Sequence, residues 1–163
     1  MMNMQDGPQT IPAIYTGETG LDRARRWQNA EARKREAARA LRDRDRETLA
    51  DLYAAYLADA SGREPSPHTA AAYLRGMNDL LDWCEAGNAE GRLAHQLTRA
   101  DATAYRLWLT LAGGRGGRPL KPASVNLRLA AARQFCESLL WAGLSAANPF
   151  GKLRNVRDPQ DPA

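Results

Sequence analysis

One stretch of the chain constrains the fold more than any other. In LKPASVNLRLAAARQFCESLLWAGLSAANPF, residues 120–150, apolar side chains recur every three or four positions, which is the spacing of one face of an α-helix. Pro122 suits the first turn of this helix, where its missing N–H costs no hydrogen bond. Gly143 is placed to end the helix, and Asn148-Pro149 indicates a turn just beyond it. The opposite face of the helix is basic and polar, so this helix is suited to lie between a core and an anionic partner.

Two capping boxes predict where two further helices begin. In such a box, the side chains of the first and fourth residues accept hydrogen bonds from each other's backbone N–H groups. Thr48 and Asp51 form one pair, and residues 61–62 (Ser-Gly) are placed to close that helix. Thr98 and Asp101 form the other pair. The inward face of the helix that starts at Thr98 is predicted to carry Ala102, Tyr105, Leu109 and Leu111.

A fourth helix is predicted to start at Ser66-Pro67, with Ser66 as the cap and Pro67 in the first turn. Residues 86–88 (Ala-Gly-Asn) are placed to stop it. No segment shows sustained alternation of apolar and polar residues, so we expect no strands. Residues 48–153 are therefore predicted to form an all-α domain, a compact four-helix bundle.

The flanking segments differ in composition from this domain. Residues 1–20 are rich in Gly, Pro, Thr and Asn without a period and are predicted to be a disordered tail. Residues 21–47 are dense in good helix formers and predict a charged helical extension in front of the bundle. Trp27 is expected to anchor this extension. Its role stays open between a basic arm that contacts DNA or a neighbouring protomer and a solvated extension. Residues 154–163 read as a linker.

Positive charge is concentrated toward the end of the chain. The net charge of the whole chain is +4. Residues 48–112 hold 5 Lys and Arg against 8 Asp and Glu, whereas residues 113–157 hold 8 against 1. Nucleic acid is the usual partner of such a basic block. A solvated basic face without a partner is the alternative that charge alone leaves open.

Several classes of protein are not supported by the sequence. Cys84 and Cys136 both fall on predicted apolar helix faces, which indicates core thiols rather than a disulfide or a metal site. His68 and His95 have no metal-ligand spacing. The glycines of GGRGGRP, residues 113–119, do not have the spacing of a phosphate-binding loop. Neither a signal peptide nor an apolar run of about 20 residues is present. We therefore expect a cytoplasmic protein without a cofactor, a metal or a membrane partner.

Three segments, taken in order, resemble one known family. They are SPHTAAAYLRGMNDLLDWC, LTRADATAYRLWL and the stretch at residues 120–150 with its Asn-Pro exit. Together they are similar to the N-terminal core-binding (SAM-like) domain of tyrosine recombinases and phage integrases, over residues 48–153. One departure is Leu127, which stands before Arg128 where the family usually continues its run of polar residues.

The resemblance implies a function in DNA integration or recombination. Family members clamp duplex DNA through the major groove, and the helices that start near Pro67 and Pro122 would cross that groove. The implied partners are double-stranded DNA, a catalytic domain of the same parent protein and neighbouring protomers on DNA. Only eleven residues follow Lys152, so we predict no catalytic residue here and expect the linker to lead toward a catalytic domain. A stand-alone DNA-binding module and a helical protein-interaction domain are the alternatives.

Ten residues are the candidate DNA contacts. Helix N-termini direct N–H groups at phosphates, and the hydroxyls of Thr69 and Ser124 would add donors there, unless they satisfy their own helices. Asn126 and Arg128 are able to read base edges or hold phosphates. Arg133 would contact phosphate or instead pair with Glu137. The other candidates for phosphate contact are His68, Arg75, Arg115, Arg118 and Lys121, of which His68 could equally face solvent and the two loop arginines could belong to a plain linker.

Overall fold

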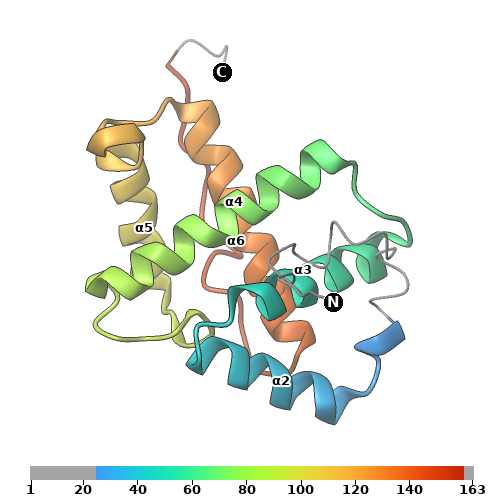
Figure 1. The fold of residues 1–163 in the computed structure, drawn as a ribbon. Coiled ribbons are helices and arrows are strands. Elements are labelled where there is room, and N and C mark those ends of the chain that lie inside the picture. Colours follow the sequence, from blue (N-terminus) through green and yellow to red (C-terminus); the bar gives the residue numbers. More distant parts are fainter. Residues whose placement is uncertain (1–24, 160–163) are drawn as a thin grey trace, which may run out of the picture. The chain divides into compact units, whose positions relative to one another are not determined.

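The computed structural model describes residues 25–159, and every regular element in that range is helical (Figure 1). The all-α prediction is therefore confirmed for this part of the chain. The chain divides into two compact units, residues 1–66 and residues 67–163, which we call the N-terminal unit and the C-terminal unit. The predicted tail at residues 1–20 lies outside the described residues. The predicted boundary between residues 47 and 48 stays a prediction.

In the N-terminal unit, helix α2 (Ala30–Arg42) packs against helix α3 (Arg46–Ser61). A continuous helix through residues 21–47 was expected, and the structure corrects this in two places. Residues 27–29 are not helical, because the Asn29 side chain caps α2 by accepting a hydrogen bond from the N–H of Ala32 at 2.9 Å. The helix then ends at Arg42, and Arg44 has a φ of 55°, a left-handed conformation that a helix does not continue through.

The start of α3 also differs from the expectation. The cap is Asp45, whose carboxylate accepts hydrogen bonds from the N–H of Thr48 at 3.1 Å and from its hydroxyl at 2.7 Å. The capping box at Thr48 is thus wrong, because Thr48 already lies inside the first turn. Asp51 instead accepts the indole N–H of Trp27 at 2.9 Å, which confirms Trp27 as an anchor. Gly62, with a φ of 71°, ends α3 as predicted.

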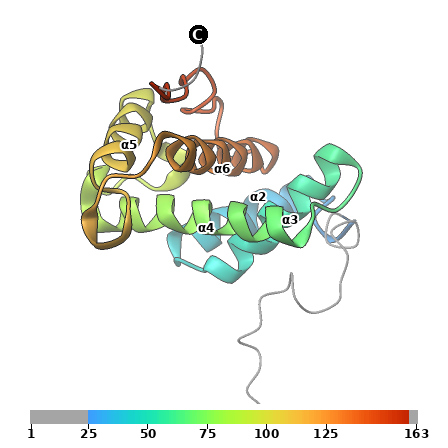
Figure 2. The same cartoon turned by 90° about the horizontal axis from the view of Figure 1, so that it is seen from above.

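The C-terminal unit contains α4 (Pro67–Trp83), α5 (Arg99–Ala112) and α6 (Pro122–Trp141). Figure 1 shows α4 crossing α6, and Figure 2 shows the two helices in adjacent layers with α5 near one end of the pair. The predicted apolar stripe of α6 is its buried face, and the central residues of that stripe have no exposed surface: Val125, Leu129, Ala132, Phe135 and Leu139. The helix starts at Pro67, Thr98 and Pro122 are confirmed within one residue.

The crossing of α4 and α6 depends on a glycine. A Cβ atom added to Gly76 of α4 would lie 2.2 Å from the Cβ atom of Ala131 of α6. That separation is far below van der Waals contact, so the backbones approach as closely as they do only because Gly76 has no side chain. Two buried small residues therefore determine how near the two helices lie.

Tyr105 is the centre of an aromatic cluster that ties α5 to the rest of the unit. Its ring lies 5.3 Å from Trp83, 6.0 Å from Trp108 and 6.0 Å from Phe150, measured between centroids. Tyr105 has no exposed surface, and this burial raises the pKa of its phenol. Phe150, which follows the predicted Asn-Pro turn, is buried as well, so the turn returns the chain to the core.

Two further side-chain predictions have opposite outcomes. Cys84 and Cys136 are both buried thiols, as expected. Leu111 was placed inward and this is wrong, since its side chain is 61% exposed. Leu109 is fully buried, and a residue two positions along a helix points to roughly the opposite side, about 200° around the axis.

Asp101 provides a pH-dependent contribution to stability. It is 6% exposed, and Arg92 donates two hydrogen bonds to its carboxylate, at 2.8 and 2.7 Å. The Arg92 guanidinium, with the N–H and hydroxyl of Thr98, lowers the pKa of Asp101 in the folded protein. In the unfolded chain an Asp carboxyl has a pKa of about 3.9, so as pH falls the unfolded chain is protonated at Asp101 before the folded protein is. The stability that the charged carboxylate contributes is therefore lost as pH falls through this value toward the folded pKa. We expect urea unfolding from pH 7 to pH 3 to show a shallower acid loss for Asp101→Asn than for the wild type or the exposed control Asp59→Asn. Equal acid slopes in all three would contradict this role.

None of the helices within residues 25–159 is long and apolar enough to span a membrane.

Candidate nucleic-acid interface

The N-terminus of α6 has no side-chain cap. Lys121 occupies the capping position, and its side chain makes no capping hydrogen bond. The first-turn N–H groups form the positive end of the helix dipole, and no acidic residue in this turn offsets that charge. Lys121 is exposed, and Ser124 is half-buried in this first turn. The arrangement suits a phosphate, which helix N-termini commonly bind.

The first turn of α4 carries the two other candidates near a helix start. His68 and Thr69 follow Pro67 directly, and both side chains are exposed. No acidic residue lies in this first turn. Arg75 lies about two turns farther along α4 and is exposed as well.

Arg75 and Arg128 bring two positive charges together at the crossing of α4 and α6. Arg128 forms an ion pair with Asp79 of α4. Burial, and then the nearby charge of Arg75, lower the pKa of Arg128. The Asp79 carboxylate pairs with Arg128, and the positive charge of Arg75 lies nearby, so an anion beside the two guanidinium groups would be stabilised. The sequence did not indicate that Asp79 lies here, because it is 49 residues away from Arg128 along the chain.

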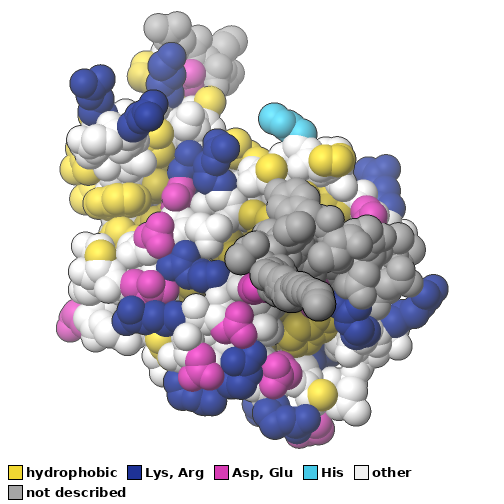
Figure 3. All heavy atoms as spheres, viewed as in Figure 1, with side chains coloured by type: hydrophobic (Ala, Val, Ile, Leu, Met, Phe, Trp, Pro, Cys, Tyr) yellow, Lys and Arg dark blue, Asp and Glu magenta, His cyan; other side chains and the backbone are white. Residues whose placement is uncertain are grey.

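The loop between α5 and α6 is basic and exposed. Arg115 and Arg118 are both exposed. Gly116 and Gly117 between them have φ angles of 67° and 77°, which glycine adopts without strain. Lys and Arg side chains gather over this loop at the upper left of Figure 3. The loop leads directly into Lys121 and α6, so its arginines belong to the same end of the C-terminal unit.

Besides Arg128, two further predicted contacts have partners within the chain. Arg133 donates to the carbonyl oxygens of Phe150 at 3.1 Å and Leu153 at 3.0 Å. The expected alternative, Glu137, instead accepts a hydrogen bond from the side chain of Asn148 at 2.6 Å. Arg133 thus holds the segment that follows α6. Direct contact between Arg133 and DNA stays a prediction.

Asn126 is the other of these two residues. Its amide accepts a hydrogen bond from the N–H of Val156 at 2.7 Å and donates one to the carbonyl oxygen of Val156 at 2.9 Å. Both hydrogen-bonding groups of the side chain are thereby directed at one residue of the chain. Base reading by Asn126 stays a prediction as well.

Several cations near these residues were not singled out from the sequence. Arg106 of α5 donates a hydrogen bond to the carbonyl oxygen of Arg154 at 2.8 Å. Lys152, Arg154 and Arg157 have exposed side chains. For Lys152, Arg154 and Arg157, the sequence signal was their membership of the basic block at residues 113–157, whereas Arg106 lies outside that block.

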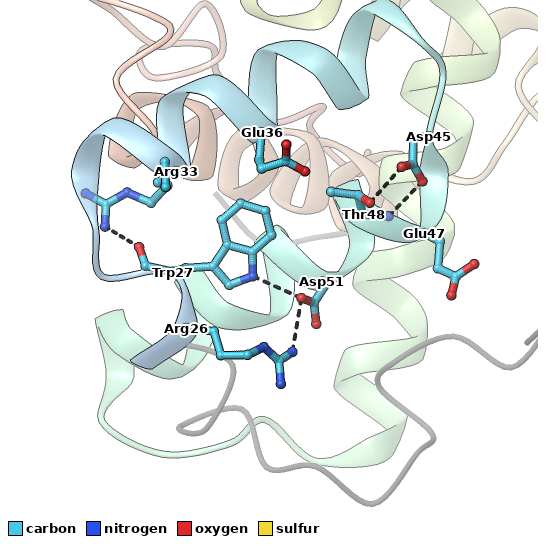
Figure 4. A pocket seen from close by; sticks show the side chains of 9 residues that line it. Arg26, Trp27, Arg33, Glu36, Asp45, Glu47, Thr48 and Asp51 are labelled. Carbon is cyan, nitrogen blue, oxygen red and sulfur yellow. Dashed lines mark hydrogen bonds and ion pairs between the residues drawn. The ribbon is translucent and has the colours of Figure 1, made fainter.

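The N-terminal unit has a separate hollow of about 440 Å³ (Figure 4). Trp27 and the charged residues Arg26, Arg33, Asp45 and Asp51 line it. These charges are largely engaged with one another and with the backbone, for example through Arg26 and Asp51 at 3.4 Å. No cluster of three or more His, Cys, Asp or Glu side chains within residues 25–159 could hold a metal ion.

Comparison with known proteins agrees with this architecture. Residues 50–143 match the family described as phage integrase, N-terminal SAM-like domain. Proteins named tyrosine recombinase XerC, from Xanthomonas campestris pv. campestris strains B100 and 8004, are each 32% identical over 98 residues. The match covers 60% of this chain and 28% of each relative, so the chain corresponds to less than a third of the curated relatives' length. No solved structure matches significantly. Because the family match extends over more than half of the sequence, the chain belongs to the family of phage integrase N-terminal SAM-like domains.

Proposed function

We propose that this chain binds duplex DNA as the core-binding domain of a tyrosine site-specific recombinase or integrase. The observation that carries the proposal is the pair of guanidinium groups, Arg75 and Arg128, at the crossing of α4 and α6. Two like charges from different helices repel each other in the free protein. A phosphate between or beside them would turn that repulsion into attraction, which is a reason to place them together on a DNA-binding face.

The other candidate contacts extend this face. Lys121 and Ser124 would bind phosphate at the uncapped start of α6, and His68 and Thr69 would do so at the start of α4. Arg115 and Arg118 would contact the backbone from the loop. Most of these contacts are with phosphates, so they would position the domain on DNA, and Arg128 is the proposed source of base readout.

Catalysis is assigned to another part of the parent protein. The relatives are named tyrosine recombinases, and the match covers 28% of their length. We propose that the strand-cutting tyrosine and its partner residues belong to a catalytic domain that closes on DNA from the opposite side. Neighbouring protomers would then meet on the DNA. The described part of this chain would bind the duplex and orient it during integration or recombination.

Substitution of single cations tests the proposal. We expect Arg75→Ala and Lys121→Ala each to weaken binding to a labelled random-sequence duplex, and to reduce the slope of log affinity against log salt by about 1. Fluorescence anisotropy at several salt concentrations measures both quantities. Circular dichroism should show unchanged helix content, because both side chains are exposed.

Arg99→Ala is the matched control for this experiment. Arg99 is exposed at the start of α5, outside the proposed face, so its removal changes net charge by the same amount without removing a contact. The proposed face is wrong if all three variants bind with the wild-type affinity and salt slope.

One observation favours the alternative of a protein-interaction domain. Leu107 and Leu111, one turn apart on α5, are 58% and 61% exposed, and a hydrophobic patch lies over α5 in Figure 3. Exposed apolar patches often mark sites of protein–protein contact. Absence of DNA binding at low salt, together with capture of a protein partner that Leu107→Glu abolishes, would favour this reading.

A further inference from the structure

The chain does not leave α6 freely. After the turn at Asn148-Pro149, residues 150–157 run back along the C-terminal unit, and we call this segment the exit strap. Figure 1 shows it returning beside α6 toward the end where that helix begins. Phe150 is buried at one end of the exit strap, where its ring meets Tyr105 edge to face.

Side chains from two helices hold the backbone of the exit strap. Arg133 binds the carbonyl oxygens of Phe150 and Leu153, and Arg106 binds that of Arg154. Asn126 binds both the N–H and the carbonyl of Val156, at 2.7 and 2.9 Å. Each bond joins one of these side chains to the backbone, so none of them engages a charged side chain of the exit strap.

The exit strap turns its cations outward. Leu153 and Val156 are half-buried, whereas Lys152, Arg154 and Arg157 are exposed. An extended segment that packs its apolar residues and presents its charged residues to solvent has the form of a surface that meets an anionic partner.

Asn126 determines where the end of the exit strap lies. It stands in the second turn of α6, shortly after Lys121 and Ser124. The two hydrogen bonds to Val156 therefore bring Arg157, the next residue, to the same end of the unit as the uncapped N-terminus of α6. A bidentate amide fixes both the position and the direction of the peptide group that it binds.

We infer that Arg157 is a further DNA phosphate contact and that Asn126 is its positioning residue. This inference rests on the proposed DNA-binding function and changes the role of one residue within it. Asn126 acts through the exit strap rather than on a base edge, since its amide oxygen and its NH2 group are both directed at Val156. The exit strap thereby becomes part of the interface instead of a passive connection.

A double-mutant cycle on the full 163-residue chain tests the inference. Arg157→Ala should reduce the salt slope by about 0.9, so that between 50 and 200 mM salt its affinity falls about threefold less than that of the wild type. Asn126→Ala should have a similar effect, and the double variant should show no further loss, because each change removes the same contact. Arg157→Lys should keep the slope, since the charge remains.

Two further measurements separate positioning from other roles. Hydrogen exchange at the Val156 amide should become faster in Asn126→Ala and stay slow in Arg157→Ala, because only the first variant removes the acceptor. Arg99→Ala, the control charge change outside the proposed face, should leave the slope at its wild-type value.

Two results would overturn the inference. One is an unchanged salt slope for Arg157→Ala while Arg75→Ala lowers it. The other is additive loss in the double variant, which would show that Asn126 contacts DNA directly. Failure of the wild-type chain to bind DNA at any salt concentration is a different outcome, because it overturns the proposed function itself.

Discussion

Replacing Phe135 with alanine is expected to lower the free energy of unfolding by about 3–5 kcal/mol. Phe135 lies at the middle of α6 and has no exposed surface. Removing its ring loses the free energy of burying that apolar surface and leaves a cavity that the surrounding side chains refill only partly. The measurement is urea or thermal unfolding followed by circular dichroism, with the native helix content compared at low denaturant.

Leu127→Ala is the control on the same helix. Its side chain is 48% exposed, so its truncation should change the free energy of unfolding by no more than about 0.5 kcal/mol. Equal losses for Phe135→Ala and Leu127→Ala would contradict the assignment of the buried face of α6. DNA binding by Phe135→Ala should remain at wild-type strength under conditions where the variant is folded.

Replacing Gly76 with alanine is expected to destabilise the protein, although alanine is the better helix former. In an exposed helix this change would gain about 0.5–1 kcal/mol. Here the new Cβ would meet the Cβ of Ala131 at 2.2 Å, and overpacking of this kind costs about 1–3 kcal/mol. The sign of the change in unfolding free energy therefore distinguishes helix propensity from helix packing.

The partner substitution supplies a rescue experiment. Ala131→Gly removes the atom that the new side chain would strike, so Gly76→Ala combined with Ala131→Gly should be more stable than Gly76→Ala alone. Residues in direct contact show such non-additive effects, whereas distant residues do not. A stabilised Gly76→Ala variant, or a double variant less stable than it, would mean that α4 and α6 cross elsewhere.

The starts of α4, α5 and α6 were predictable because the signals are local. Pro67 and Pro122 suit a first helical turn by their own geometry. Thr98 and Asp101 exchange hydrogen bonds across three residues, and the structure contains both bonds, at 3.1 and 2.8 Å. Where every group that defines a boundary lies within a few residues, inspection of those residues is sufficient.

The failures arose where two local signals competed or a distant group intervened. Thr48 was predicted as the cap of α3, but Asp45, three residues earlier, accepts its N–H and its hydroxyl. Asp51 is engaged by Trp27, 24 residues earlier in the chain. Leu111 was assigned inward from hydrophobicity alone, but the packed side of α5 is defined by Tyr105 and Leu109. Apolar composition does not say which of two apolar sides faces the core.

For the candidate site, the sequence was sufficient to locate the positive charge but not to say which charges are available. The basic block and the helix starts follow from residue order, since a helix places neighbouring residues by a fixed rotation. The engagement of Arg128 with Asp79 and of Asn126 with Val156 joins residues 49 and 30 positions apart. Such contacts exist only once α4 crosses α6 and the exit strap returns along it. Local hydrogen bonding and apolar period thus set the helices, whereas the close approach at Gly76 and the packing of Phe150 set which polar groups meet.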